Sequence, residues 1–276
     1  MRSTYSTLND CQMQRNAGVG LFTRPSSLIF KKRRHRRHRI KPMPPTKLMG
    51  INIVEKIDDK VKVGHVLVSV SDKSGLDAFI PEMIELNPDI RFFSTGGTFV
   101  RLREILGTNA DTCLTRVSDY TGQPETQGGL VKTLDFRIYL GLLTETYNDA
   151  HQQDLKRTDS VAIDMVVVNL YPFKETIAKP GVTTEQARGN IDIGGPCMIR
   201  ASAKNFIRVA SVVDPSDYAR VLADIAAHQG MISLDLRFHL ARKAFEHTAV
   251  YDRTIADFLA AENYDAVKGC YQKVEG

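Results

Sequence analysis

The chain has 276 residues, of which 42% are hydrophobic, so it is long enough to bury a full core in one large domain. Its net charge of +5 comes from residues 1–49, which hold 12 of the 37 Lys and Arg side chains and one acid, whereas residues 50–276 carry 25 basic and 31 acidic side chains. The acidic balance of residues 50–276 argues against nucleic-acid binding, and no apolar run approaches the roughly 18 residues that a membrane span needs.

The four cysteines have neither a CxxC pair nor the spacing of metal ligands (Cys11, Cys113, Cys197, Cys270). Scattered cysteines are typical of free thiols in a reducing compartment. We therefore expect a cytoplasmic protein that binds no metal through them.

Residues 1–49 do not resemble a packed segment, because the basic run Lys31–Lys41 is followed by the proline-rich stretch Pro42–Pro45. Three interpretations are open: an upstream extension from a misplaced start, a targeting segment, or a nucleic-acid-binding arm. We favour a disordered extension, since Met43 or Met49 would serve as a normal start. The expected domains are this extension (1–49), a catalytic domain (50–262) and a C-terminal tail (263–276).

From His65 onward, strand, small polar loop and helix follow one another twice. The expected strands are Val66–Val70 and Ile90–Phe93, the loops are Ser71–Gly75 and Ser94–Thr98, and the helices are Leu76–Ile84 and Val100–Leu106. Pro81 is expected to bend or interrupt the first helix. Repeated units of this kind predict a parallel sheet, whose ligands bind at the carboxyl ends of the strands.

Both loops contain groups that bind phosphate. The hydroxyls come from Ser69, Ser71, Ser74, Thr95 and Thr98, the close backbone amides from Gly75, Gly96 and Gly97, and a positive charge from Lys73. Such groups together stabilise an anion. Neither loop has a Walker or dinucleotide fingerprint, so ordinary turn chemistry is the alternative for each.

The segment Ile163–Val168, in which four of six residues are β-branched, predicts a strand that is buried on both faces. It leads into Asn169–Phe173, so Tyr171 is expected at a carboxyl strand end; a tyrosine packed under a loop is the alternative. Beyond it the sequence predicts a helix at Thr183–Arg188, a strand at Arg208–Val213, a helix at Pro215–His228 and a helical segment at Leu234–Leu259. We interpret His239 and His247 in the last segment as packing or capping residues.

The stretch NIDIGGPCMIRASAKN (Asn190–Asn205) lies at the centre of the pattern. Asp192 precedes a Gly-Gly-Pro turn, after which Cys197–Lys204 is helical in spacing. Glycines let the backbone approach a ligand, and free amides at a helix start stabilise an anion or a developing oxyanion. Lys204 lies about two helical turns along. A helix cap with a solvated lysine is the alternative interpretation.

Six segments occur together in a specific order and spacing. They are SVSDKSG (Ser69–Gly75), STGGT (Ser94–Thr98), GGLVKTL (Gly128–Leu134), NLYPF (Asn169–Phe173), NIDIGG…ASAKN (Asn190–Asn205) and KAFEHTAVYD (Lys243–Asp252). From about Val66 to Leu259 the chain resembles the IMP cyclohydrolase domain of the bifunctional purine-biosynthesis family that also carries AICAR formyltransferase. The formyltransferase half has no counterpart in this sequence, so we expect a stand-alone cyclohydrolase.

The resemblance implies a methylglyoxal-synthase-like α/β fold, with a mostly parallel sheet, flanking helices and a C-terminal helical segment. It implies closure of the purine ring of FAICAR, 5-formamidoimidazole-4-carboxamide ribotide, to give IMP and water without a cofactor or a metal. It also implies a homodimer, and a separate AICAR formyltransferase as a partner.

By the same resemblance, the catalytic residues are Lys132, Tyr171, Asp192 and Lys204. Asp192 is suited to polarise or deprotonate the carboxamide, and the other three are suited to donate to the oxygen or to relay protons. The substrate is expected to lie on Ser69, Ser71, Lys73, Ser74, Thr95, Gly96, Gly97, Thr98, Thr133, Asn169, Leu170, Ile193 and Gly194.

Two departures from the family pattern affect this expectation. Leu130 stands where the family usually has Arg, and Asp135, Phe136 and Tyr139 replace His, Pro and His. Losing one charge-assisted contact costs about 1.5–3 kcal/mol, roughly 10–150-fold in affinity, and Arg137 is a candidate to supply the charge. Because the catalytic positions are intact, we expect an active enzyme. The alternative is a non-catalytic nucleotide-binding or regulatory domain that acts with a separate formyltransferase.

Overall fold

The structure is a computed structural model that describes residues 52–124 and 131–274. All of these residues belong to one compact unit, 42–276. The extension expected at 1–49 and the departure at Leu130 lie outside the described residues. No helix in the described part of the chain is long and apolar enough to cross a membrane.

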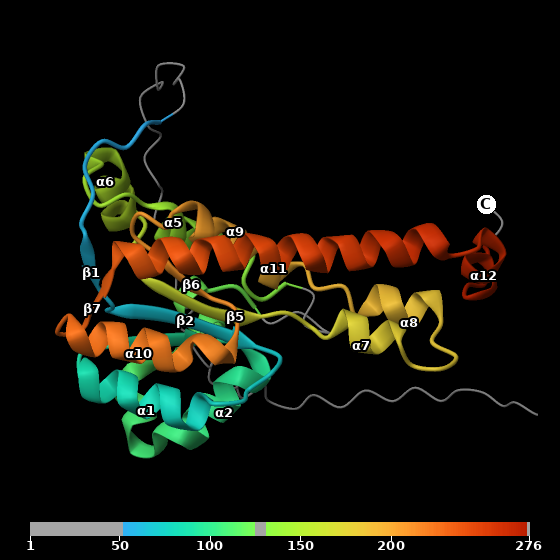
Figure 1. Ribbon diagram of the computed structural model, residues 1–276, viewed down its shortest axis with the longest axis horizontal. Coiled ribbons are helices and arrows are strands. Elements are labelled where there is room, and N and C mark those ends of the chain that lie inside the picture. Colours follow the sequence, from blue (N-terminus) through green and yellow to red (C-terminus); the bar gives the residue numbers. More distant parts are fainter. Residues whose placement is uncertain (1–51, 125–130, 275–276) are drawn as a thin grey trace, which may run out of the picture. The chain divides into compact units, whose positions relative to one another are not determined.

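Five parallel strands form the central sheet, in the order β4-β3-β2-β5-β6. Figure 1 shows β2, β5 and β6 of this sheet between α11 and α10. In chain order they are β2 (His65–Val70), β3 (Arg91–Ser94), β4 (Leu114–Arg116), β5 (Met165–Asn169) and β6 (Ala210–Val212). The chain runs outward from β2 to β4 and then crosses to β5 on the other side of β2, so the strand order reverses between β2 and β5. This confirms the predicted α/β fold with a parallel sheet.

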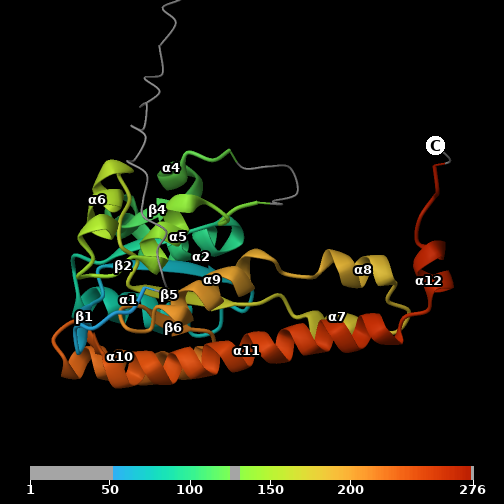
Figure 2. The ribbon, with the colours of Figure 1, turned by 90° about the horizontal axis from the view of Figure 1, so that it is seen from above.

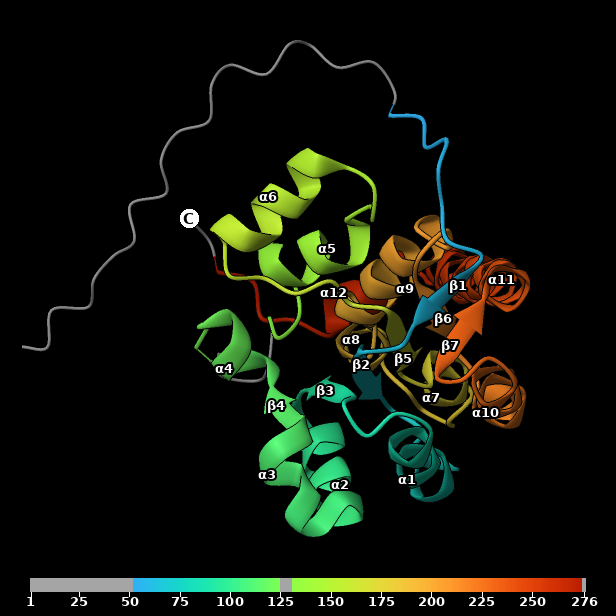
Figure 3. The same ribbon diagram turned by 90° about the vertical axis from the view of Figure 1, so that its left-hand side faces the viewer.

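Helices cover both faces of the sheet, as Figure 3 shows. On one face, α1 (Leu76–Leu86), α2 (Gly96–Leu106) and α10 (Tyr218–Ala227) share a core with Val66, Val68 and Val167. On the other face, α5 (Phe136–Leu143), α9 (Gly194–Lys204) and α11 (Leu234–Ala261) pack with Leu67 and Val166. Successive residues of β2 and β5 are therefore buried on opposite faces, which explains their uninterrupted apolar sequences.

The structure corrects two expectations about helices. α2 begins at Gly96, four residues before the expected start at Val100, so the second polar loop is largely the first turn of a helix. α1 continues from Leu76 to Leu86 through Pro81 without interruption. The carbonyl that loses its bond to the missing Pro81 amide belongs to Asp77 in the exposed first turn, where water can replace that bond.

Several short elements carry no clear periodic signal. β1 (Lys60–Lys62) pairs in antiparallel fashion with β7 (Met231–Ser233), and both strands have three residues. The short helices are η1 (Gly107–Asn109), α3 (Ala110–Cys113), α4 (Val117–Thr121), α6 (Asp149–Arg157), η3 (Pro215–Asp217) and α12 (Tyr264–Gly269). Elements of this length show at most one buried face position per turn, so sequence periodicity does not reveal them.

The helix α11 has 28 residues and continues past the end of the sheet, where α7 (Phe173–Ile177) lies against it (Figure 2). α8 (Thr184–Gly189) packs beside α7, and its Thr184 hydroxyl donates to the carboxylate of Glu262, the C-cap of α11. Aromatic rings make the contact between α7 and α11: the Phe173 centroid lies 6.2 Å from that of Tyr251 and 5.8 Å from that of Phe258. The excursion from β5 through α7 and α8 to α9 is thus supported by α11.

Candidate active site

A cavity of about 640 Å³ opens at the carboxyl ends of β2 and β5. Its walls come from the segment after β2, the first turn of α2, the segment 131–134, the segment after β5, and residues 188–198 at the start of α9. This position, next to the reversal of strand order, is the usual ligand site of an open parallel sheet.

The first turn of α2 forms one wall of the cavity. Thr95 is its extended N-cap and Gly96 has a φ of +50°, a conformation that favours glycine. The Thr98 hydroxyl accepts from the Val70 amide at 3.1 Å and donates to the Val70 carbonyl at 2.9 Å, which fixes this turn to the end of β2. Amides of a first helical turn have no partner inside the helix, so this wall is suited to a phosphate.

The loop after β2 is shaped by Asn169 at the end of the neighbouring strand β5. Its side-chain oxygen accepts from the Ser71 and Asp72 amides at 2.7 and 2.9 Å, and its amide nitrogen donates to the Asp72 carbonyl at 2.8 Å. The Lys73 ammonium donates to the Ser71 carbonyl at 3.2 Å and lines the cavity. Asn169 therefore acts on the shape of the loop as well as lining the cavity.

Lys132 and Thr133 connect two helix starts across the cavity. The Lys132 ammonium nitrogen lies 3.4 Å from the position that a Cβ would take at Gly96, at the start of α2. The Thr133 hydroxyl lies 2.8 Å from the corresponding position at Gly194, at the start of α9. The segment thus brings a cation to the phosphate-suited wall and a hydroxyl to the opposite wall.

Asp192 occupies the opposite wall, immediately before α9. Its Oδ1 accepts from the Gly195 amide at 2.9 Å, and the carboxylate also accepts from the Tyr171 backbone amide. Burial raises the pKa of the Asp192 carboxyl, although both hydrogen bonds act to lower it. A Cβ at Gly195 would lie 2.6 Å from Asp192 Oδ2 and from Leu170 Cδ2, so this glycine lets the carboxylate fold back over the helix start.

The arrangement combines three chemical capacities. The half-buried Asp192 carboxylate, with its raised pKa, can accept or hold a proton closer to neutral pH than an ordinary aspartate. The Gly194 amide at the start of α9 and the Lys132 ammonium can stabilise developing negative charge. The side chain of Tyr171 lines the cavity and is 47% exposed, so its hydroxyl is accessible to a ligand.

Two family models match successive parts of the chain. Residues 75–197 match the MGS-like domain and residues 202–275 match the AICARFT/IMPCHase bienzyme. The bifunctional purine biosynthesis protein PurH of Magnetococcus marinus is 45% identical over 210 residues, which are 76% of this chain and 38% of that protein. The chain belongs to the AICARFT/IMPCHase family.

Other members of the AICARFT/IMPCHase family show the same partial coverage. PurH of Synechococcus sp. is 47% identical over 204 residues, 74% of this chain and 38% of that protein, and PurH of Streptococcus pneumoniae strain 70585 is 49% identical over 198 residues, 72% and 37%. The chain thus spans less than two fifths of the length of these relatives. The crystal structure of ForH superposes with a TM-score of 0.63 at 30% identity and covers 72% of this chain and 97% of ForH.

Most of the site residues expected from the AICARFT/IMPCHase resemblance line one cavity. They are Ser69, Ser71, Lys73, Thr95, Gly96, Gly97, Thr98, Lys132, Thr133, Asn169, Tyr171, Asp192, Ile193 and Gly194. Ser74 and Leu170 lie outside its lining. The Ser74 hydroxyl donates to Asp72 Oδ1 at 2.6 Å, and Leu170 is buried with its side chain close to Gly195.

Lys204 also lies outside the cavity lining of this chain. It is the exposed last residue of α9, and ten residues at about 1.5 Å each place it roughly 15 Å along the helix from Gly194. Its catalytic role stays a prediction.

Sequence reasoning missed several residues of the cavity wall: Val70, Val131, Leu134, Arg188, Gly189, Ile191, Gly195 and Met198. Arg188 adds a cation to the wall, where its guanidinium pairs with Glu185 at 2.6 Å. It lies two residues before the stretch Asn190–Asn205, but an Arg near the end of a helix has no distinguishing pattern of its own.

Three residues that depart from the AICARFT/IMPCHase pattern, Asp135, Phe136 and Tyr139, lie at the start of α5 and within it. Asp135 is the N-cap of α5 and accepts from the Arg137 amide at 2.8 Å. Phe136 is 57% exposed, and burial raises the pKa of the Tyr139 phenol beside Cys197. The suggestion that Arg137 supplies a charge to the nucleotide is wrong, because its guanidinium donates to the Tyr120 and Asp159 carbonyls and does not line the cavity.

Proposed function

We propose that this chain is an IMP cyclohydrolase, which closes the purine ring of FAICAR to give IMP and water. Family membership supports a role in purine biosynthesis, and one observation about its own residues supports the specific reaction. A wall suited to a phosphate and a wall with the half-buried Asp192 carboxylate face the same cavity, and Lys132 lies at the phosphate-suited wall.

In this reaction the carboxamide nitrogen of the substrate attacks the carbon of its formyl group. A C–N bond forms, the formyl oxygen takes up negative charge and then a proton, and it departs as water with a proton from nitrogen. Both reacting groups belong to one molecule, so holding them in contact removes several kcal/mol of the barrier. A carboxamide is a weak nucleophile, so a nearby base is also needed.

The residues of the cavity are assigned accordingly. Asp192 accepts the proton from the carboxamide nitrogen, which its raised pKa favours. Lys132 and the Gly194 amide at the start of α9 stabilise the developing oxyanion, and Tyr171 relays a proton to the departing oxygen. The loop from Ser69 to Lys73 and the first turn of α2 hold the ribotide phosphate.

Spectroscopic measurement of FAICAR closure by the isolated chain tests this proposal. Asp192→Asn and Lys132→Ala are each expected to lower kcat about 100- to 10,000-fold, the usual contribution of a positioned acid, base or oxyanion donor. Lys62→Ala is the control. Lys62 is the last residue of β1, its side chain is 63% exposed and it does not line the cavity, so kcat should stay unchanged. A wild-type chain that leaves FAICAR unchanged refutes the proposal.

One observation favours a second candidate, a domain that binds a nucleotide without turning it over. Three of the four residues expected to be catalytic line the cavity, and Lys204 does not. Calorimetry with IMP that shows binding, together with an absence of FAICAR closure, would select this candidate. If the chain closes FAICAR, Lys204→Ala tests the predicted catalytic role of Lys204, because an unchanged kcat would mean that the cavity acts without this lysine.

Homodimer formation, a cytoplasmic location and a separate AICAR formyltransferase as the source of FAICAR are also proposed on family membership. Light scattering of the purified chain tests the first of these.

A further inference from the structure

The segment that carries Asp192 has no regular secondary structure of its own. It spans Asn190–Ile193, between the end of α8 and the start of α9. Asp192 must nevertheless hold a fixed orientation if it is to act on a bound molecule, because a displacement of about 1 Å can reduce a rate about 100-fold. A contact from outside the segment is therefore needed to fix its backbone.

Tyr251 of α11 makes that contact. Its hydroxyl accepts from the Asp192 amide at 2.8 Å and donates to the Asn190 carbonyl at 3.4 Å. The same hydroxyl therefore bonds to the backbone on both sides of Ile191, as an acceptor at Asp192 and as a donor at Asn190. Tyr251 does not line the cavity, so it reaches a ligand through this segment and not directly.

The ring of Tyr251 contacts the second segment that lines the cavity. It packs edge-on against Phe173, with centroids 6.2 Å apart and planes at 68°. Phe173 is 2% exposed and follows Tyr171 by two residues. A single side chain of α11 therefore supports the backbone of Asp192 by hydrogen bonds and the segment of Tyr171 by ring packing.

We propose that Tyr251 is a positioning residue of the active site, through which α11 fixes Asp192 relative to Tyr171. The sequence motif KAFEHTAVYD, which ends one residue after Tyr251, thereby gains a role in the chemistry as well as in packing. The inference rests on the proposed function for its kinetic consequence, but its structural consequence can be measured without activity.

The test uses Tyr251→Phe in the full chain, which keeps the ring against Phe173 and removes the hydroxyl. We expect kcat for FAICAR closure to fall roughly three- to tenfold, as for loss of one neutral hydrogen bond, and KM to change less than twofold, because the phosphate wall is distant. Amide hydrogen exchange at 191–193 should accelerate while β5 stays unchanged. Tyr264→Phe, at a side chain that is 71% exposed, is the matched control and should change none of these.

If Tyr251 contributed only to the stability of the fold, Tyr251→Phe would leave the pKa of the Asp192 carboxyl unchanged. The titratable groups near this segment include Tyr171, Tyr251 and Asp252, with Lys132 and Arg188 on the same cavity, and Tyr251→Phe alters one of them. We expect the acid limb of the pH–kcat profile to move, since a looser segment admits water to the Asp192 carboxylate.

Unchanged exchange at 191–193, or faster exchange with an unchanged kcat and acid limb, overturns the proposal. If the wild-type chain proves inactive, the proposed function fails separately. The Asp192 carboxyl titration, followed by carbon NMR in both chains, then decides the matter. A displaced midpoint in Tyr251→Phe supports positioning, and an identical midpoint refutes it.

Discussion

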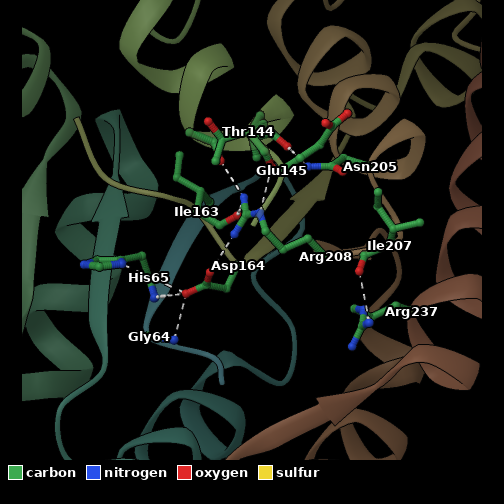
Figure 4. Close-up of polar contacts among 12 residues, drawn as sticks. Gly64, His65, Thr144, Glu145, Ile163, Asp164, Asn205, Ile207, Arg208 and Arg237 are labelled. Atoms are coloured by element: carbon green, nitrogen blue, oxygen red, sulfur yellow. Dashed lines mark hydrogen bonds and ion pairs between the residues drawn. The ribbon is translucent and has the colours of Figure 1, made fainter. Parts of the chain in front are cut away.

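At the amino edge of the central sheet, the buried side chains of Arg208 and Asp164 are bonded to each other and to the backbone, whereas at the carboxyl edge Lys132 and Asp192 face a cavity. Figure 4 shows the amino edge. The Arg208 guanidinium donates to Asp164 Oδ1 at 2.8 Å, and three backbone carbonyls take its remaining bonds. Asp164 Oδ2 accepts from the Gly64 and His65 amides, each at 2.9 Å.

The carboxyl edge has fewer internal contacts for its charges. Asp192 accepts hydrogen bonds from two backbone amides, and among the residues that the structure describes no cation pairs with its carboxylate. Burial raises the pKa of this carboxyl. The two edges of the sheet therefore use charge differently. At the amino edge, buried opposite charges neutralise one another and hold neighbouring strands together. At the carboxyl edge, desolvation disfavours the ionised Asp192, which makes this carboxylate available for a reaction with a ligand.

Breaking the amino edge should have the largest effect on stability. Asp164→Ala leaves the Arg208 charge, at 4% exposure, without its carboxylate and also frees two amides at the start of β2. Loss of one partner of a buried pair costs about 3–5 kcal/mol. Urea unfolding measures this loss, and kcat per folded molecule should change little because the cavity lies at the other edge.

Asp89→Ala provides the matched control for that experiment. Asp89 pairs with Lys62 at 3.8 Å, but their side chains are 86% and 63% exposed, so the loss should stay below about 1 kcal/mol. Equal effects of the two substitutions would show that the amino edge is not the stabilising cluster described here.

Gly195→Ala should have the next largest effect, and it acts on the carboxyl edge. The added Cβ would meet Asp192 Oδ2 and Leu170 Cδ2 at 2.6 Å, so the carboxylate must move. We expect kcat to fall on the order of 100-fold, with a stability loss of about 1–3 kcal/mol from overpacking. Gly269→Ala, where nothing lies within 4 Å of the added atom, should alter neither quantity by a comparable amount. A kcat within threefold of wild type would contradict the described geometry of Asp192.

The sequence predicted the sheet because segments rich in β-branched residues, such as Ile163–Val168, follow the pattern of strands buried on both faces. The resemblance to the AICARFT/IMPCHase family implied that Asp192, Tyr171 and Lys132 act together, and all three line one cavity. It did not predict that Lys204 would lie outside the cavity lining, because helical spacing gives a face of α9 and not the extent of a cavity.

The amino edge escaped prediction for a different reason. Arg208 and Asp164 are 44 residues apart and belong to different strand ends, so no local pattern links them. Two signals were available, since Asp164 lies within the predicted strand Ile163–Val168 and Arg208 begins the predicted strand Arg208–Val213. A charge in such a strand is unusual unless it has a buried partner. The same limit applies to Tyr251, whose bond to Asp192 spans 59 residues.

The smallest expected effect concerns how the stability of the chain depends on pH. Because burial raises the folded-state pKa of Asp192 above the ordinary 3.8, its ionisation favours the unfolded chain, so stability falls as pH rises through 3.8 and levels off once the folded carboxyl ionises. Asp192→Asn lacks this cost and keeps an oxygen that can accept from the Gly195 amide. Urea unfolding from pH 3.5 to 7 should therefore show a gain in unfolding free energy for Asp192→Asn that appears only as pH rises.

Asp214 supplies the contrast that makes this result specific. The Lys243 ammonium hydrogen-bonds Asp214 and lowers the pKa of its carboxyl to about 2, so its ionisation favours the folded chain above pH 3.8, and this contribution is lost as pH falls towards 2. Asp214→Asn should therefore lower stability at pH 7, opposite in sign to Asp192→Asn. If both substitutions changed the unfolding free energy at pH 7 in the same direction, the view that burial disfavours the ionised form of Asp192 would be contradicted.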